Sequence, residues 1–405
     1  MPSTYFFFRP ILAADRSWAA ADWQPGTFSP APDADFAACY SDSDAASLAG
    51  LLALVRPAQA SGREEQLQTN EFAARHVVFI APSSVLQDTN AVERYKALRA
   101  RGCPVGIELD DVSILRRIPI DAFSHVRFDA AFVRQEFSTA DLSYFRDAGF
   151  FKIAANVDSY EMFGWLAGRG VEWSASHFLT GHNPNLGKEP DLTRLKLLKL
   201  LNLVRNDGDT REIEAVFREE PKLSYHLLRL VNSVAVGART KISSFSQAIA
   251  ILGRRQLQRW LQLLVYANNL ADGHAPNPLM QLAAARGRQM ELICGAIDPK
   301  PGVPDLADNA FITGLFSLLD VLINLPMSEI VKELPVHEAV IEALSSPNTG
   351  GALGRLVSAV AAGEAGQFAM AERALAELGI TPELHSRAQV AALHWASRIN
   401  IENSD

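Results

Sequence analysis

Four side chains at the ends of two apolar runs could take part in metal-dependent chemistry. Asp110 and Asp111 follow the run VGIEL, and Arg127 and Asp129 lie in the run HVRFD. Carboxylate oxygens are the ligands that Mg²⁺ prefers, and two bound ions can generate a nucleophilic hydroxide. Adjacent strand residues point to opposite faces, so only one of Asp110 and Asp111 can face a shared site. These carboxylates alone could hold one weakly bound Mg²⁺, and the alternative is that they are strand-end or loop residues without a ligand.

Other catalytic arrangements are missing from the sequence. None of the nine histidines precedes an aspartate, and they are scattered along the chain, whereas a metal site needs close, convergent ligands. The run GHNPNLGK at 181–188 lacks the spacing of a phosphate loop and has no Ser or Thr after its Lys. There is no nucleophile elbow and no dinucleotide-binding fingerprint. We therefore expect no catalytic residue, no metal and no cofactor.

The composition limits the partners and the compartment. Lys and Arg number 38 against 46 Asp and Glu, giving a net charge of -8, which does not favour nucleic acid or an anionic membrane. The apolar run at 5–8 is broken by Arg9 and Pro10, so it predicts neither a signal peptide nor a membrane span. Cys39, Cys103 and Cys294 are far apart in the sequence and form no CxxC or other metal-binding spacing. This pattern fits a reducing compartment better than a disulfide-bonded scaffold. We expect a cytoplasmic protein.

Strand and helix patterns alternate in the first half of the chain. Short apolar or aromatic runs predict strands at 5–8, 77–81, 105–109, 125–129, 151–157 and 174–179, with helices at 90–101, 142–148 and 159–168 between them. A further helix is predicted around 48–55. Repeated strand–helix units imply parallel strands with helices outside, and a barrel is the natural closure for so many of them.

The second half of the chain reads as helical throughout. Apolar residues recur at steps of three and four in segments such as 279–297, 311–325, 353–362 and 382–399, and no long run alternates at period two. This pattern predicts an all-α bundle. The polar run at 181–188 is the predicted linker. The predicted domains are therefore residues 1–185, an α/β barrel of the TIM type, and residues 190–400, a helical bundle.

The stretch 221–264 predicts three helices joined by two short connectors, and it carries a family resemblance. Its runs LLRLVNS and ISSFSQAIAILG, followed by a basic, leucine-rich helix, resemble the HDOD domain, a helical relative of the HD phosphohydrolases that has lost their metal ligands. The residues that match the HDOD motif are Asn232, Ser233, Ser243, Ser244, Gln247 and Gly253. Helix capping and turn formation explain the serines and Gln247 without a ligand.

Residues 77–183 resemble the second half of an EAL domain, the barrel that hydrolyses cyclic di-GMP with two divalent metals. By this resemblance Asp110 and Asp111 correspond to the family's paired aspartates, Arg127 to its lysine and Asp129 to its next aspartate. The departures are larger than the agreement: VVFIAPSSVL contains no acid where the signature glutamate belongs, and Ala155 stands at a metal-binding glutamate. The resemblance therefore implies a degenerate EAL domain in front of an HDOD domain.

Arg254, Arg255 and Arg259 lie around one side of a predicted helix. They could contact an acidic partner or a nucleotide phosphate, because Arg binds carboxylate and phosphate through paired hydrogen bonds. The alternative is a solvated helix face with internal salt bridges.

The resemblance implies a non-catalytic bacterial signalling protein that contacts other signalling proteins and is linked to cyclic di-GMP control of motility, biofilm or virulence. Two alternatives stay open. One is residual cyclic di-GMP hydrolysis that uses Asp110, Asp111 and Asp129. The other is a sensor that binds cyclic di-GMP without cleaving it.

Overall fold

A computed structural model describes residues 4–26, 53–57, 77–181, 247, 258–259, 261–262, 278–297, 306–323, 325–334 and 336–397. The chain divides into two compact units. Unit 1 contains residues 1–179, 362–373 and 381–390, and unit 2 contains residues 180–361, 374–380 and 391–405. The first change of unit, at Leu179, lies close to the predicted linker; the domain limits 1–185 and 190–400 stay a prediction.

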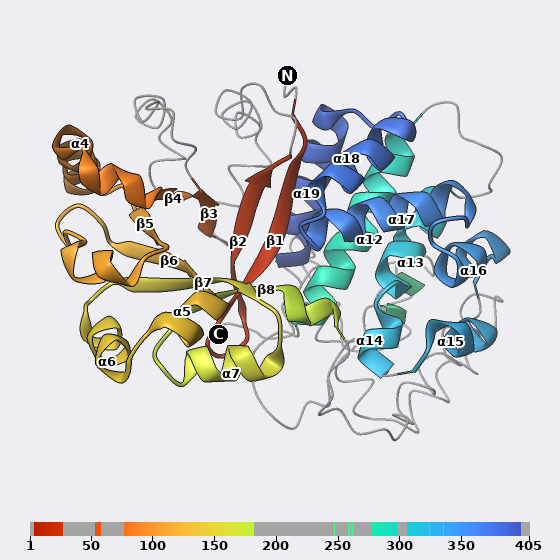
Figure 1. The fold of residues 1–405 in the computed structure, drawn as a ribbon. Coiled ribbons are helices and arrows are strands. Elements are labelled where there is room, and N and C mark those ends of the chain that lie inside the picture. Colours follow the sequence, from red (N-terminus) through yellow and green to blue (C-terminus); the bar gives the residue numbers. More distant parts are fainter. Residues whose placement is uncertain are drawn as a thin grey trace. The chain divides into compact units, whose positions relative to one another are not determined.

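Unit 1 contains a closed barrel in which each strand pairs with its neighbours in the order of the sequence (Figure 1). Its strands are β1 Phe6–Ala13, β2 Trp18–Pro25, β3 Ala53–Pro57, β4 Val77–Ala81, β5 Val105–Leu109, β6 His125–Asp129, β7 Phe151–Val157 and β8 Trp173–Ser176. The predicted α/β barrel is therefore confirmed, and β4 to β7 have the predicted bounds.

The first part of the barrel differs from the predicted pattern. β1 runs antiparallel to both of its neighbours, β2 and β8, whereas all other pairs are parallel. A tight turn joins β1 to β2, in which Asp15 Oδ1 accepts hydrogen bonds from the Ser17 backbone N–H and hydroxyl. The helix predicted at 48–55 is wrong in its second half, because Ala53–Pro57 forms β3 between β2 and β4. A short apolar run is compatible with a helix or with a buried strand. Here the residues form a strand because they pair with β2 and β4.

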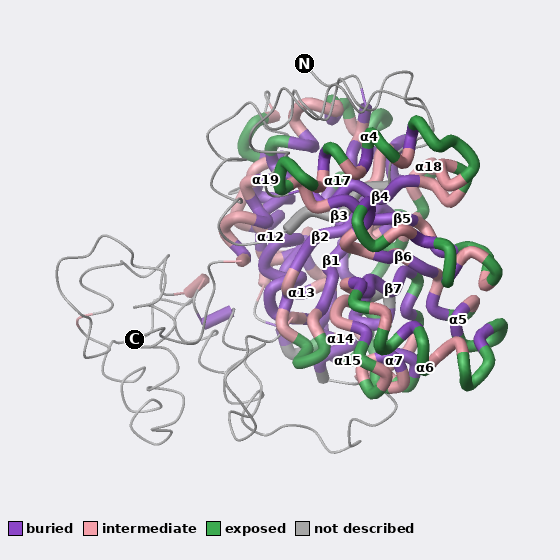
Figure 2. Tube along the Cα trace, turned by 90° about the vertical axis from the view of Figure 1, so that its left-hand side faces the viewer, coloured by how far each residue is buried: buried purple, intermediate pink, exposed green. Residues whose placement is uncertain are grey.

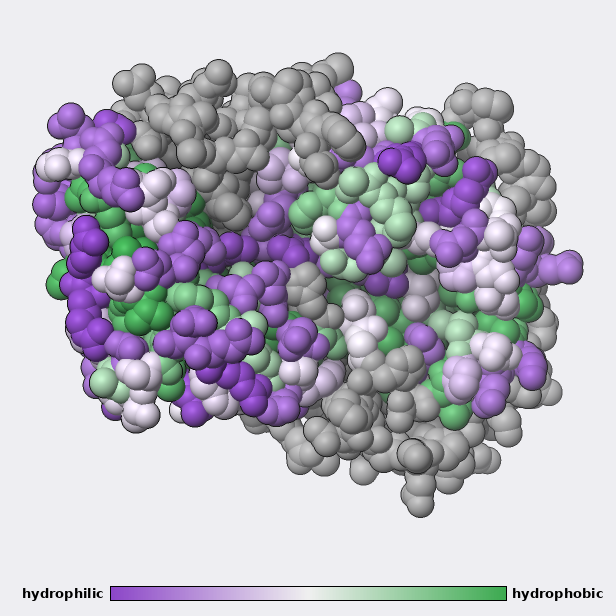
Figure 3. All heavy atoms as spheres, in the orientation of Figure 1, coloured by the Kyte–Doolittle hydropathy of each residue, from purple (hydrophilic) through white to green (hydrophobic). Residues whose placement is uncertain are grey.

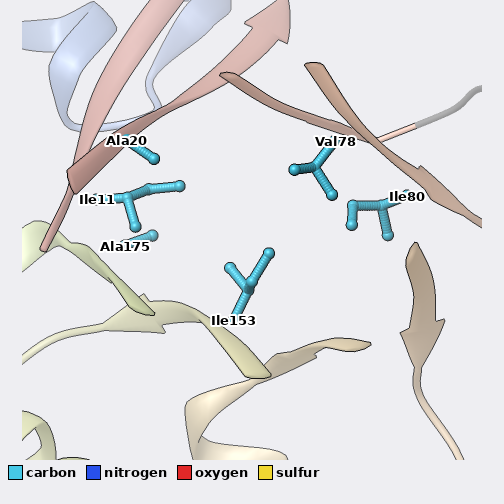
Figure 4. Packing of buried hydrophobic residues seen from close by; sticks show 6 residues of the cluster. All are labelled: Ile11, Ala20, Val78, Ile80, Ile153 and Ala175. Atoms are coloured by element: carbon cyan, nitrogen blue, oxygen red, sulfur yellow. The ribbon is translucent and has the colours of Figure 1, made fainter. Parts of the chain in front are cut away.

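Small and branched apolar side chains fill the barrel interior. Figure 4 shows Ile11, Ala20, Val78, Ile80, Ile153 and Ala175 pointing toward one another from five strands, and each of them is buried. Gly106 of β5 belongs to the same packing, because a Cβ at this position would lie 2.5 Å from Ile80 Cδ1. Residues two positions from these along a strand share the interior face, which places further side chains inside the barrel.

Helices cover the outside of the barrel, as predicted. They are α4 Thr89–Ala100, α5 Ala130–Glu136, α6 Thr139–Asp147 and α7 Tyr160–Ala167. Each begins at a residue whose side chain accepts a backbone N–H, for example Ser138, which forms a capping box with Asp141 in α6. Phe145 of α6 packs edge-on against Phe128 of β6, with ring centroids 5.1 Å apart. In Figure 2 the tube of β1, β2 and β4 to β7 is largely buried, while α5 and α6 expose one side to solvent.

In the second half of the chain every regular element that the structure describes is a helix, as predicted. Its helices are α12 Pro278–Ala296, α13 Leu306–Phe316, α14 Leu319–Ile323, α15 Met327–Glu333, α16 Glu338–Ser345, α17 Gly351–Glu364, α18 Phe368–Glu377 and α19 Pro382–Ser397. None of the helices in the described part of the chain has the length and apolar character required to cross a bilayer.

Glycines allow α12 and α13 of unit 2 to pack closely. A Cβ at Gly314 would lie 2.7 Å from the Gly287 Cα, and a Cβ at Gly287 would lie 2.7 Å from the Phe311 carbonyl oxygen. The obstacles are backbone atoms, which cannot rotate away as a side chain can. The sequence of either helix alone gives no sign of this contact.

We expect Gly314→Ala to lower the free energy of unfolding, because the new methyl group would force the α12 and α13 backbones apart at a well-packed contact. A loss of roughly 1–3 kcal/mol in urea titrations is the expected size. Gly295→Ala in α12 is the matched control, since a methyl group there would meet no atom within 4 Å and Ala favours the helix. Equal effects of the two substitutions would contradict the close contact.

Two segments near the C-terminus, residues 362–373 and 381–390, belong to unit 1 and contact β1. The carbonyl oxygen of Tyr5 accepts the Gly26 N–H, so the next carbonyl, that of Phe6, faces away from β2. β8 pairs only with Ile11–Ala13 and leaves that edge of β1 unpaired at Phe6. His385 Nε2 lies 2.9 Å from the Phe6 carbonyl oxygen and, in the tautomer with hydrogen on Nε2, donates to it. The imidazole thus replaces a strand neighbour.

Burial lowers the pKa of His385 to about 4, although the bond to the Phe6 carbonyl opposes the shift. An unfolded histidine titrates near 6.5, so between about pH 6.5 and pH 4 the unfolded chain binds the additional proton. The contribution of the neutral His385 to the free energy of unfolding is therefore complete above about pH 6.5 and is lost as the pH falls toward 4. We expect the free energy of unfolding to drop by about 2 kcal/mol from this group between about pH 7 and pH 5.

Urea titrations at several pH values test this expectation. His385→Gln, which can still donate to the carbonyl, should flatten the profile without abolishing it, because burial also lowers the pKa of His125 to about 4. An unchanged slope in His385→Gln would contradict the assignment.

Candidate functional site

Four charged side chains form a network inside the barrel. Arg9 Nη2 donates to Asp22 Oδ2 at 2.7 Å, and Arg127 Nη1 donates to both oxygens of Glu108 at 3.0 Å. Arg127 Nη2 lies 3.8 Å from Asp22 Oδ2 and joins the two pairs. We call these four residues the charge network.

The strand register explains why the network lies inside the barrel. Arg9 is two residues from Ile11 and Asp22 is two residues from Ala20, so both share the face of the apolar core. Arg9 and Asp22 are register partners across β1 and β2, as Glu108 and Arg127 are across β5 and β6. Because β2 and β6 are not adjacent, the contact between Asp22 and Arg127 crosses the interior.

The network is balanced in charge and largely shielded from water. The side chains of Asp22, Arg9 and Arg127 are 1%, 9% and 12% exposed, and that of Glu108 is 28% exposed. Burial raises the pKa of Glu108, while the Arg127 guanidinium opposes that shift. Charges in a low-dielectric interior are costly unless they are paired, and here each carboxylate has an arginine. The site is suited to holding the strands in register.

Of the four network residues, the sequence predicts only Arg127 as a site residue. Arg9 interrupts an apolar run, and Glu108 lies within a predicted strand. Asp22 lies in the run AAADWQP, which carries no clear strand period. One sequence feature could have pointed to Arg9 as a site residue: it is a charged residue inside a strand-like apolar run. No local pattern shows that β1 and β5 contribute to one interior.

The predicted aspartates lie at strand ends and accept hydrogen bonds from the protein. Asp110 Oδ2 accepts from the Ser83 hydroxyl at 2.7 Å. Asp111 caps the short helix that follows β5 by accepting the Ser113 N–H at 2.7 Å, and this bond lowers its pKa. Both side chains belong to exposed residues. They do not come together as a pair around one ligand.

Asp129 has the most donors of the predicted carboxylates. Its Oδ1 accepts the backbone N–H groups of Ala131 and Phe132 at the start of α5, and its Oδ2 accepts Asn156 Nδ2 at 2.8 Å. Asn156 has a φ of 54°, a conformation that asparagine tolerates better than most residues. Ala155, the register partner of Asp129 on β7, is buried and offers no ligand atom.

These residues do not fit a two-metal centre. Such a centre requires several carboxylates with free lone pairs around a common point. Asp22 and Glu108 face arginines, while Asp110 and Asp129 accept protein hydrogens. Among the residues that the structure describes, no three His, Cys, Asp or Glu side chains gather as a metal site would need.

Arg259 lies in unit 2 and forms an internal ion-pair cluster. Its guanidinium pairs with Glu291 and with Asp308, the latter at 3.0 Å, and lies 5.0 Å from the centre of the Phe311 ring. The side chain is 20% exposed. This geometry favours the internal salt bridge over the partner contact for Arg259. Arg254 and Arg255 lie outside the described residues, so their role as a partner-binding surface stays a prediction.

Most of the HDOD motif residues lie outside the described part of the chain: Asn232, Ser233, Ser243, Ser244 and Gly253. Gln247 is described as helical and half-buried. Residues 192–335 match the family model of the HDOD domain. The chain contains an HDOD domain. The resemblance inferred from LLRLVNS and ISSFSQAIAILG is thereby confirmed.

Two curated relatives match part of the chain. The uncharacterized protein YuxH of Bacillus subtilis (strain 168) is 27% identical over 192 residues, which are 46% of this chain and 42% of that protein. Cyclic di-GMP phosphodiesterase CdgJ of Vibrio cholerae serotype O1 is 29% identical over 192 residues, which are 47% of this chain and 43% of that protein. Each match spans less than half of the relative's own length.

Solved structures similar to the chain include EAL domains. The PaMucR phosphodiesterase in complex with c-di-GMP has 14% sequence identity and a TM-score of 0.34, covering 44% of this chain and 95% of that chain. The FimX EAL domain from Pseudomonas aeruginosa bound to c-di-GMP has 14% identity and a TM-score of 0.32, covering 44% of this chain and 90% of that chain. The barrel itself is defined by its own strand pairing.

We expect Arg127→Met to destabilise unit 1 by about 3 kcal/mol, because removing one partner leaves Glu108 and part of the Asp22 charge uncompensated inside the barrel. Chemical denaturation followed by tryptophan fluorescence would measure the loss.

Arg116→Met is the matched control. Arg116 pairs with Asp141 at 2.7 Å but its side chain is 51% exposed, and Figure 3 shows a mainly hydrophilic surface over α6 and α7. Exposed ion pairs contribute at most about 1 kcal/mol. A loss in Arg127→Met no larger than in Arg116→Met would contradict the stabilising role of the network.

Proposed function

We propose that this chain is a non-catalytic signalling protein in which the HDOD-containing half contacts other signalling proteins. The observation that carries the proposal is the state of the barrel's carboxylates. Asp22 and Glu108 are paired with arginines, and Asp110 and Asp129 accept hydrogen bonds from neighbouring groups. A hydrolase that used two divalent metals would need several carboxylates directed at a common point, whereas two of these carboxylates are committed to arginines.

The link to cyclic di-GMP is part of the same proposal. It is supported by the match to CdgJ, whose name describes a cyclic di-GMP phosphodiesterase. That match covers less than half of CdgJ. The HDOD domain adds no metal ligand set of its own in the sequence, since no histidine precedes an aspartate. We therefore propose that the protein acts through contacts in a cyclic di-GMP pathway.

We expect the purified chain not to convert cyclic di-GMP to the linear dinucleotide above a protein-free control, with either Mg²⁺ or Mn²⁺ present. Chromatography of the nucleotides after overnight incubation is the measurement. Turnover that disappears in Asp110→Ala would overturn the non-catalytic proposal, because this substitution removes a carboxylate while leaving the charge network intact.

An equilibrium titration with cyclic di-GMP separates the remaining alternative. Binding without turnover would replace the pure contact protein with a sensor. Absence of binding would leave protein contacts as the means of action, and a pull-down with the full chain would then identify the partner.

A further inference from the structure

The two C-terminal segments of unit 1, residues 362–373 and 381–390, are here called the latch. Together with residues 1–179 they form one compact unit. Residues 180–361, which separate the barrel strands from the latch in the sequence, belong to unit 2. The HDOD match at 192–335 lies within that intervening stretch. The barrel unit therefore encloses the HDOD segment in sequence, and both ends of that segment lead back to unit 1.

The latch contacts β1 through rings. Phe368 at the start of α18 stacks on Phe7, with centroids 5.1 Å apart and an angle of 15° between the rings. His385 lies 5.2 Å from the Phe7 ring and 5.8 Å from the Tyr5 ring. Gly363 at the end of α17 lets the backbone approach, since a Cβ there would lie 2.5 Å from Phe7 Cδ1.

The same segment reaches the charge network. The Arg9 guanidinium carbon lies 5.8 Å from the centre of the Phe368 ring, within the range of a cation–π contact. Arg9 is the residue at one end of the network and pairs with Asp22. Phe368 therefore shields the Arg9–Asp22 pair on the side where β1 begins. Water admitted at this point would raise the local dielectric and weaken the pair.

From these contacts we propose that the latch is a releasable cover of β1 and of Arg9, which couples the chain segment carrying the HDOD domain to the charge network of the barrel. The His385 hydrogen bond and ring contacts centred on Phe7 hold the latch on β1. Met370 of the latch does not take part in these contacts and is 53% exposed. A local segment of a folded protein can open at a lower free energy than the barrel as a whole. Opening exposes the β1 edge and hydrates Arg9, so the state of the latch and the strength of the network depend on each other.

Hydrogen exchange measured by mass spectrometry on the full chain tests the proposal. Phe368→Ala removes the ring on Phe7 and Arg9, and His385→Ala removes the hydrogen bond to the Phe6 carbonyl. Each variant should speed amide exchange in peptides that cover residues 5–10 by roughly tenfold or more, as expected for local opening. Peptides that cover β4 should keep their exchange rates, because β4 contributes no residue to the charge network and the ring contacts and the hydrogen bond of the latch are made to β1.

Met370→Ala is the matched control, since it changes the exposed side of the same helix and should leave exchange in β1 unchanged. Equal acceleration in β1 and in β4 would overturn the proposal, because the latch would then be part of a single cooperative core. Unchanged exchange in residues 5–10 of both variants would overturn it as well, since the latch would then not protect β1.

Discussion

The barrel depends on keeping four charges paired in its interior. Arg9 and Asp22 come from the first two strands, while Glu108 and Arg127 come from the opposite wall. Each of the two pairs links register partners on adjacent strands, and the contact from Arg127 to Asp22 joins the walls. A register shift of one residue would turn these side chains to the outer face and leave partners behind. The network therefore fixes the register at a cost in desolvation that only complete pairing offsets.

The same pairing accounts for the proposed absence of catalysis. Carboxylates that bind two divalent ions must converge on them, but in this barrel Asp22 and Glu108 pair with arginines and Asp129 caps a helix. The arginines thus supply the positive charge that balances the carboxylates of this interior. Such an interior can be stable without any ligand, and the chain's function is then free to depend on surfaces.

The antiparallel β1 creates a second constraint, an edge that β8 pairs only in part. Sheet edges with unpaired backbone groups are liabilities, and proteins cover them with proline or with other elements. Here Pro10 lacks a donor, and His385 bonds to the Phe6 carbonyl from the far end of the chain. Unit 1 consequently needs residues from both ends of the sequence, with the HDOD segment between them. The chain connectivity therefore ties the barrel to the helical half.

Local patterns in the sequence determined the βα units from Val77 onward, the helices of the second half and the HDOD motif, because each depends on periodicity and capping within a short stretch. The departures at Ala155 and around Val77 predict that no metal centre forms, and this stays a prediction. Only the tertiary structure decided the direction of β1, the strand at Ala53–Pro57, the pairing of Asp22 with Arg127 and the packing of residues 362–373 and 381–390 on β1. Each of these brings together residues that lie far apart in the chain or depends on which strands pair. A sequence specifies which side chains can pair, but the closure of the barrel selects the pairs that form.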